Sequence, residues 1–159
     1  MAEFGDLAVS ELKRMGFYGI VSSRKSTIFP KEDQRMNHAV TDSVMYVGVD
    51  DKTIDLFESQ YVVPNGVSYN SYVILDEKVA VMDTVDARAA DQWLSNVEQV
   101  LQGRTPDYLV VSHMEPDHSA SIQILAEKYP DMKIVGNAKT FQMMSQFFTM
   151  DFSGRSHVV

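Results

Sequence analysis

The last third of the chain alternates between strand-like and helix-like segments, and this alternation constrains the fold more than any other feature. The apolar run DYLVVS at residues 107–112 predicts a short buried strand, and residues 120–130 predict a helix that ends at Pro130. A second strand is predicted at residues 133–137 (KIVGN) and a second helix at residues 138–148. Strands that alternate with helices pair in parallel, so we expect a parallel sheet here.

The middle of the chain carries a β-rich pattern of a different kind. Residues 41–51 (TDSVMYVGVDD) form an apolar, β-branched run that ends in an acidic turn and predicts a strand. Residues 68–75 and 78–84 predict two further strands, joined by a turn at Asp76–Glu77. Such closely spaced strands pair in an antiparallel manner, so we expect this part of the sheet to be antiparallel.

Helical spacing separates these two regions, over residues 87–102. Its apolar positions fall on one stripe, made of Ala90, Trp93, Leu94, Val97, Val100 and Leu101. Gly103 and Pro106 end the helical pattern. We therefore expect an α/β (α+β) fold, with a mixed β-sheet and helices on one face.

Composition narrows the class of protein. A chain of 159 residues is long enough for one domain with a hydrophobic core. Its net charge of −8 argues against nucleic acid and anionic membrane as partners, because both require a basic surface. The absence of cysteine excludes disulfides, thiolate zinc sites and iron–sulfur clusters in this chain. No apolar run approaches the roughly 20 residues of a membrane helix, and we expect a cytoplasmic protein.

The first 35 residues differ in charge from the rest. Residues 1–35 hold six basic and five acidic side chains, whereas the remainder holds eight and seventeen. Glu3, Asp6 and Glu11 precede the apolar stretch MGFYGIV, although a signal or transit peptide is poor in acidic residues at its start. We expect residues 1–35 to be an extension of unknown role, and Met36 to be an alternative start.

The chemistry concentrates in residues 112–119, SHMEPDHS, which follow the strand at 107–112. The carboxyl ends of strands are where α/β sheets place their sites. His113 and Glu115 share one side of an extended chain, because side chains alternate. The bend at Pro116 lets Asp117 and His118 point elsewhere. The loop therefore offers two pairs of ligands to two neighbouring metal ions.

The residue types of this loop bear on which metal it binds. Two imidazoles and two carboxylates contain no soft sulfur ligand, which favours iron or manganese and leaves zinc possible. An incidental polar loop is the alternative interpretation. The following helix is predicted to begin near Ser119, with Ser119 or Asp117 as its N-cap.

The motif HMEPDH resembles the H-x-E-x-D-H signature of flavodiiron proteins. The resemblance extends to MYVGVDD, to residues 61–86, to residues 106–122 and to VGNAKTF. Zinc hydrolases of the metallo-β-lactamase superfamily carry H-x-H-x-D-H instead, with a second His where this chain has Glu115. The resemblance therefore implies the N-terminal part of a metallo-β-lactamase-like αββα sandwich rather than an ordinary zinc hydrolase.

The resemblance also implies a ligand set and an activity. His113 and Glu115 would bind the iron nearer the flavin, and Asp117 and His118 would bind the second iron. Asp83 matches a strand-end aspartate that orients the ligands from the second shell, although a turn-starting Asp is the alternative. The complete protein would hold two Fe ions and FMN, reduce O₂ to water and/or NO to N₂O, and form homo-oligomers. Its electrons would come from a flavodoxin-like domain or a rubredoxin-type donor.

The chain departs from the family pattern after the motif. The family site also needs a further His, a bridging Asp and a final His, followed by a flavodoxin-like FMN domain. His157 lies only 39 residues after His118, too close for the family's next ligand. We therefore expect residues 36–159 to form an incomplete diiron domain that is inactive alone. The alternatives are a zinc-dependent hydrolase of the superfamily and a non-catalytic diiron oxygen-sensing module.

Overall fold

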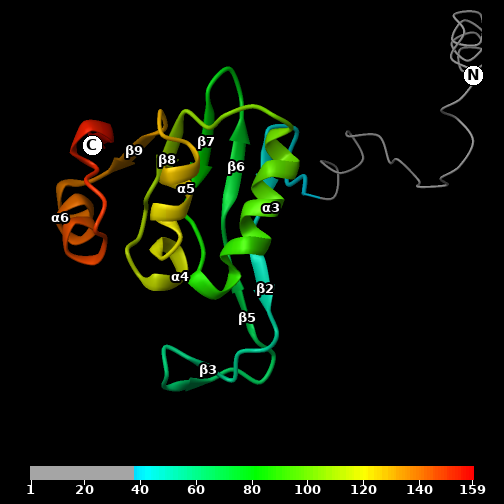
Figure 1. Ribbon diagram of the computed structural model, residues 1–159. Coiled ribbons are helices and arrows are strands. Elements are labelled where there is room, and N and C mark those ends of the chain that lie inside the picture. The colour runs from blue at the N-terminus through cyan, green and yellow to red at the C-terminus, as the bar shows by residue number, and fades with distance from the viewer. Residues whose placement is uncertain (1–37) are drawn as a thin grey trace, which may run out of the picture.

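The computed structural model describes residues 38–159, so the extension expected at residues 1–35 lies outside the described part. A six-stranded sheet with the order β1-β6-β7-β8-β9-β10 forms its centre (Figure 1). The strands are β1 (Val44–Tyr46), β6 (Tyr72–Leu75), β7 (Val79–Met82), β8 (Tyr108–Val110), β9 (Lys133–Gly136) and β10 (Ser156–Val158). The first three pair antiparallel and the last four pair parallel, which confirms the predicted mixed sheet.

Each parallel connection passes through a helix. The helices are α3 (Ala90–Leu101), preceded by the 3₁₀ turn η1 (Ala87–Ala89), then α4 (Pro116–Ser119), α5 (Ile122–Lys128) and α6 (Ala138–Phe147). A second 3₁₀ turn, η2 (Ser153–Arg155), leads into β10. Helices α3 and α5 lie on the same face of the sheet (Figure 1). None of the helices in residues 38–159 has the length and apolar character required to cross a membrane.

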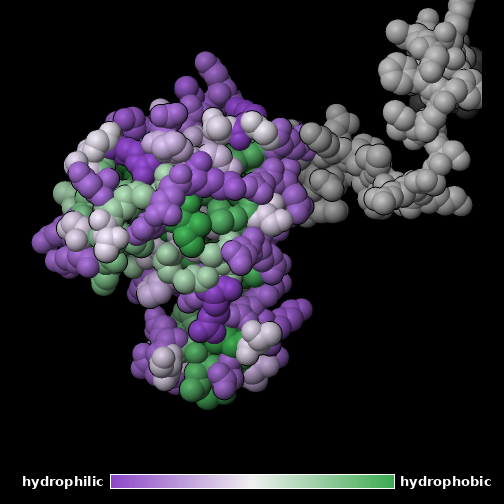
Figure 2. All heavy atoms as spheres, viewed as in Figure 1, coloured by the Kyte–Doolittle hydropathy of each residue, from purple (hydrophilic) through white to green (hydrophobic). Residues whose placement is uncertain are grey.

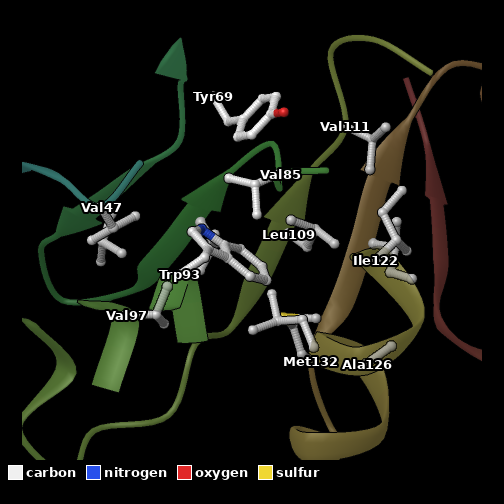
Figure 3. Close-up of a cluster of buried hydrophobic side chains, with 14 of the residues drawn as sticks. Val47, Tyr69, Val85, Trp93, Val97, Leu109, Val111, Ile122, Ala126 and Met132 are labelled. Atoms are coloured by element: carbon white, nitrogen blue, oxygen red, sulfur yellow. The ribbon is translucent and has the colours of Figure 1, made fainter. Parts of the chain in front are cut away.

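The core lies between the sheet and these two helices (Figure 3). Trp93 of α3 is fully buried there, and its indole Nε1–H donates to the hydroxyl of Ser71 at 3.0 Å. Leu109 of β8 and Ile122 of α5 pack in the same cluster. The predicted stripe of α3 is confirmed, since Leu94 alone among its six residues is only half-buried. Burial of this stripe is what fixes the helix on the sheet.

The antiparallel part is a two-stranded ribbon that is interrupted between β1 and the next strand. Residues 41–51 contain not one strand, as predicted, but two: β1 and β2 (Val49–Asp51), which belong to different sheets. Their partners β6 and β5 (Val67–Tyr69) divide the predicted strand 68–75 in the same way. Gly48 lies between β1 and β2, and a Cβ atom there would lie 2.2 Å from the carbonyl oxygen of Tyr69. The close approach of the two chains therefore requires glycine.

Two further elements were not predicted. A hairpin of β3 (Leu56–Phe57) and β4 (Tyr61–Val62) projects from the end of the antiparallel ribbon (Figure 1). Hydrophobic residues gather at this projecting end (Figure 2), where Tyr61 and Val62 are exposed. Strand β10 pairs parallel with β9 and forms the edge of the central sheet. These strands are only two and three residues long, which is too short for a clear periodic pattern.

Candidate metal centre

The motif loop begins where β8 ends, at the carboxyl end of a parallel strand. Helix α4 starts at Pro116 with Glu115 as its N-cap, and the predicted helix is α5, which starts at Ile122 with Ser121 as its N-cap, so the prediction of Ser119 or Asp117 as the N-cap was wrong. Proline is well suited to the first helical position, because the N–H that it lacks would have no partner there. The Ser119 hydroxyl instead donates to the carbonyls of Met114 and Glu115, each at 3.0 Å. The Ser119 hydroxyl therefore ties the first turn of α4 to the backbone of the motif.

His113 and Glu115 form the first pair of the motif. The imidazole Nε2 of His113 lies 3.0 Å from a carboxylate oxygen of Glu115, as the alternation of side chains predicts. Both side chains are about half exposed, at 51% and 57%. They line a groove of about 490 Å³, together with Lys139 and Phe147 from α6. This pair thus faces an open, solvent-accessible hollow.

Asp117 and His118 form the second pair, which is more enclosed. His118 Nε2 lies 3.5 Å from an Asp117 oxygen, and His118 Nδ1 lies 3.5 Å from an oxygen of Asp83. The exposed fraction is 28% for the His118 side chain and 19% for Asp117. The two imidazoles of the motif meet edge to face, with ring centroids 5.5 Å apart. The structure therefore brings both pairs into one neighbourhood.

Two residues that follow β7 form hydrogen bonds to the first and the last part of the motif. Asp83 Oδ1 accepts a hydrogen bond from the backbone N–H of Ser112 at 2.7 Å, and its Oδ2 accepts from the Ser112 hydroxyl. The backbone N–H and the hydroxyl of Thr84 both donate to the carbonyl of His118, at 2.8 Å each. Sequence reasoning selected Asp83 but missed Thr84 and Ser112. Their place at the ends of neighbouring parallel strands was the signal that could have found them.

Asp83 itself has a left-handed backbone, with φ of +54°. Its carboxylate contacts the loop after β8 and the ring of His118, which lie 29 and 35 positions further along the chain. A turn-starting aspartate bonds to its own turn instead. The geometry of Asp83 therefore differs from the turn interpretation and places it beside the motif.

The motif offers donor atoms of the types that bind metal ions, two imidazoles and two carboxylates. Within residues 38–159, no three His, Asp or Glu side chains converge as a ready-made metal-binding group. However, Asp117 Oδ1 is buried without a hydrogen-bond partner in this part of the chain, and His118 Nδ1 makes no hydrogen bond there either, although it lies 3.5 Å from an Asp83 oxygen. A buried polar atom without a partner is costly, and a cation bound to Asp117 would satisfy its Oδ1. The donor types thus fit metal ions. Each pair offers two ligands, which is fewer than a metal ion requires.

The other two histidines lie away from this neighbourhood. His38 Nδ1 lies 2.8 Å from the carbonyl of Tyr46, which gives this imidazole a structural partner. His157 lies in β10, where it pairs with Val135 of β9 and is exposed to solvent. Neither contributes to the motif.

Known proteins with similar sequences were found for this chain, although not among family models. No family model matches the chain. It is 34% identical over 98 residues to the flavo-diiron protein FprA2 of Clostridium acetobutylicum, covering 62% of this chain and 24% of that protein. It is 35% identical over 96 residues to the anaerobic nitric oxide reductase flavorubredoxin of Vibrio vulnificus, covering 60% of this chain and 19% of that protein.

Solved structures agree with these sequence matches. The flavodiiron protein from Giardia intestinalis matches with a TM-score of 0.71 and 28% identity, over 77% of this chain and 29% of that one. Rubredoxin oxygen:oxidoreductase from Desulfovibrio gigas matches with a TM-score of 0.69 and 30% identity, over 76% and 30%. The fold is therefore that of a metallo-β-lactamase-like domain, in the mixed α/β class.

Within that class, the resemblance to flavodiiron proteins is confirmed in both sequence and fold. The chain spans 24% of the Clostridium acetobutylicum protein and 19% of the Vibrio vulnificus protein.

Proposed function

We propose that this chain is part of a flavodiiron-type oxidoreductase, in which the motif after β8 binds two iron ions. His113 and Glu115 bind one ion, and Asp117 and His118 bind the other. The observation that carries the proposal is the buried, unpartnered Oδ1 of Asp117, which lies with the imidazole of His118 beside the exposed His113–Glu115 pair. Glu115 also stands where zinc hydrolases have a histidine, which favours iron through its added oxygen donor.

The part of this chain in the reaction is to hold and orient the metal ions. Asp83 approaches His118 at 3.5 Å, so that it orients the imidazole from outside the ligand set. When bound, the iron ions and FMN supply the electrons that reduce O₂ to water or NO to N₂O. Relatives named as a nitric oxide reductase and a rubredoxin oxygen:oxidoreductase support both substrates. The electron donor is a flavodoxin-like FMN domain or a rubredoxin-type protein.

We further propose that residues 36–159 are an incomplete diiron domain, inactive alone and active in a homo-oligomer of the complete protein. The face of the sheet opposite α3 and α5 supports this proposal. Cross-strand neighbours Tyr72, Met82, Val110 and Val135 form an apolar row on it, and each is only half-buried. A second sheet packed on this row would bury it and complete the αββα sandwich.

The proposal is tested by the metal content of the chain, prepared without oxygen and dialysed against ferrous iron. Wild type is expected to retain more iron than His113→Ala and Glu115→Ala, because each change removes a ligand. His157→Ala is the matched control, since its imidazole is exposed on β10, away from the motif. Equal iron content in wild type and both motif variants would overturn the proposal. Retention of zinc with esterase activity would support a hydrolase instead.

A further inference from the structure

We propose that the two ligand pairs are unequal, and that the Asp117–His118 pair, positioned by Thr84, takes the first metal ion. This inference rests on the proposed function and adds an order of metal loading and a positioning residue to it. The reason is preorganisation: a pair that is already fixed loses less conformational freedom when an ion binds.

Thr84 fixes the backbone of the enclosed pair. Its N–H and its hydroxyl both donate to the carbonyl of His118, at 2.8 Å each. Thr84 has no exposed surface, so water does not compete for these two bonds. The His118 backbone also donates its N–H to the carbonyl of Glu115, at 2.9 Å. Both polar backbone groups of His118 are therefore held before any metal ion arrives.

The side chains of this pair are confined as well. Each ring nitrogen of His118 faces a carboxylate oxygen at 3.5 Å, from Asp83 on one side and Asp117 on the other. Asp83 is itself held by two hydrogen bonds from Ser112. The imidazole of His118 thus sits between two carboxylates, one of which has a fixed position.

The His113–Glu115 pair lacks this support. Its side chains are 51% and 57% exposed. Among residues 38–159, the interactions of these two side chains are the ion pair between them and the ring contact from His113 to His118. Exposed histidine and glutamate side chains keep their rotamer freedom and lose it on binding. This pair is therefore expected to fill second.

The order is tested by following the histidine rings in NMR spectra while Zn²⁺ is added to the full chain. The sequence holds four histidines, and the His113→Gln and His118→Gln variants assign the two signals of interest. We expect the His118 ring to respond at a lower zinc concentration than the His113 ring. A His113 response that comes first, or together with that of His118, would overturn the inference and leave the proposed function standing.

The role of Thr84 is tested by the same measurement on Thr84→Val, which keeps the shape and removes the hydroxyl. Loss of a residue that orients a ligand weakens metal affinity about 10–100-fold. We expect Thr84→Val to raise the zinc concentration at which the His118 ring responds by a factor near the lower end of this range, because the Thr84 N–H remains. Thr84→Ser restores the hydroxyl and is expected to behave as wild type. Thr53→Val is the control, since it removes a hydroxyl that donates to Asp51 at 2.8 Å, remote from the motif.

The melting temperature of each metal-free variant separates positioning from stability. A purely structural Thr84 would lower the melting temperature and leave the zinc response of His118 unchanged, which would overturn its positioning role. If Thr84→Val does not fold, Thr84→Ser and the order in wild type still decide the inference. If neither ring responds to millimolar zinc, the proposed metal site itself is wrong, and the inference falls with it.

Discussion

The carboxylate of Asp83 accepts a hydrogen bond from the backbone N–H of Ser112 at 2.7 Å, and so connects the end of β7 to the loop that follows β8. The bond joins two strands that are neighbours in the sheet and far apart in the chain. It sets the starting point of the motif before the chain reaches His113. The position of the ligands therefore depends on a residue that precedes them by about 30 positions.

We expect Asp83→Asn to lower the free energy of unfolding by about 1–3 kcal/mol, because it weakens hydrogen bonds made to a charged acceptor. Asparagine tolerates the left-handed backbone of this position, so the loss reports on the carboxylate rather than on strain. Urea denaturation measures it. Asp76→Asn is the control, because Asp76 accepts one bond in an exposed turn. Equal losses in the two variants would contradict a special role for Asp83.

The close approach of the two chains in the antiparallel ribbon depends on Gly48. We expect Gly48→Ala to destabilise the chain by about 1–3 kcal/mol, as overpacking does in other cores. The added methyl group would meet the carbonyl of Tyr69 at 2.2 Å, and backbone cannot move aside as a flexible side chain can. Thermal unfolding followed by circular dichroism measures the loss. Gly154→Ala has open space around its new Cβ and should be close to neutral.

Ser71 connects the core to the candidate site. Its hydroxyl accepts from Trp93 Nε1 at 3.0 Å and donates to the carbonyl of Asp83 at 3.0 Å. Ser71→Ala leaves both partners without this bond in a buried place, which should cost about 1–3 kcal/mol. Fluorescence of Trp93 reports the unfolding, since the chain has one tryptophan. Ser145→Ala removes an exposed hydroxyl on α6 and should change little; a similar loss there would argue against the buried network.

Asp51 makes the stability of the protein depend on pH in the acidic range. Hydrogen bonds from the Thr53 hydroxyl and backbone N–H, and from Ile54, hold the pKa of this carboxyl below its ordinary value of 3.8. Because the folded pKa is the lower one, this stabilisation is present above the ordinary pKa and is lost as the pH falls through the lowered one. We expect Asp51→Asn to be less stable at pH 7 and to lose less stability on acidification, as measured by urea unfolding at each pH. Parallel pH profiles for the two proteins would refute this.

Local patterns in the sequence determined several features of this protein. The stripe on residues 90–101 predicted α3, because burial of apolar positions at helical spacing is a property of the segment itself. The alternation in the last third predicted the parallel strands β8 and β9. The spacing of His113 and Glu115 predicted their contact, because side chains two positions apart lie on one side of an extended chain.

Tertiary structure decided what local patterns could not. Gly48 lies against the carbonyl of Tyr69, 21 positions away, whereas residues 41–51 by themselves predict a single strand. The hydrogen bonds from Thr84 to the His118 carbonyl join residues 34 positions apart. They form only because β7 and β8 lie side by side. Residue types and spacing within the motif specified which donors the chain offers. Pairing of distant strands specified which of those donors are buried and held in place, because burial and orientation depend on neighbours in space rather than in sequence.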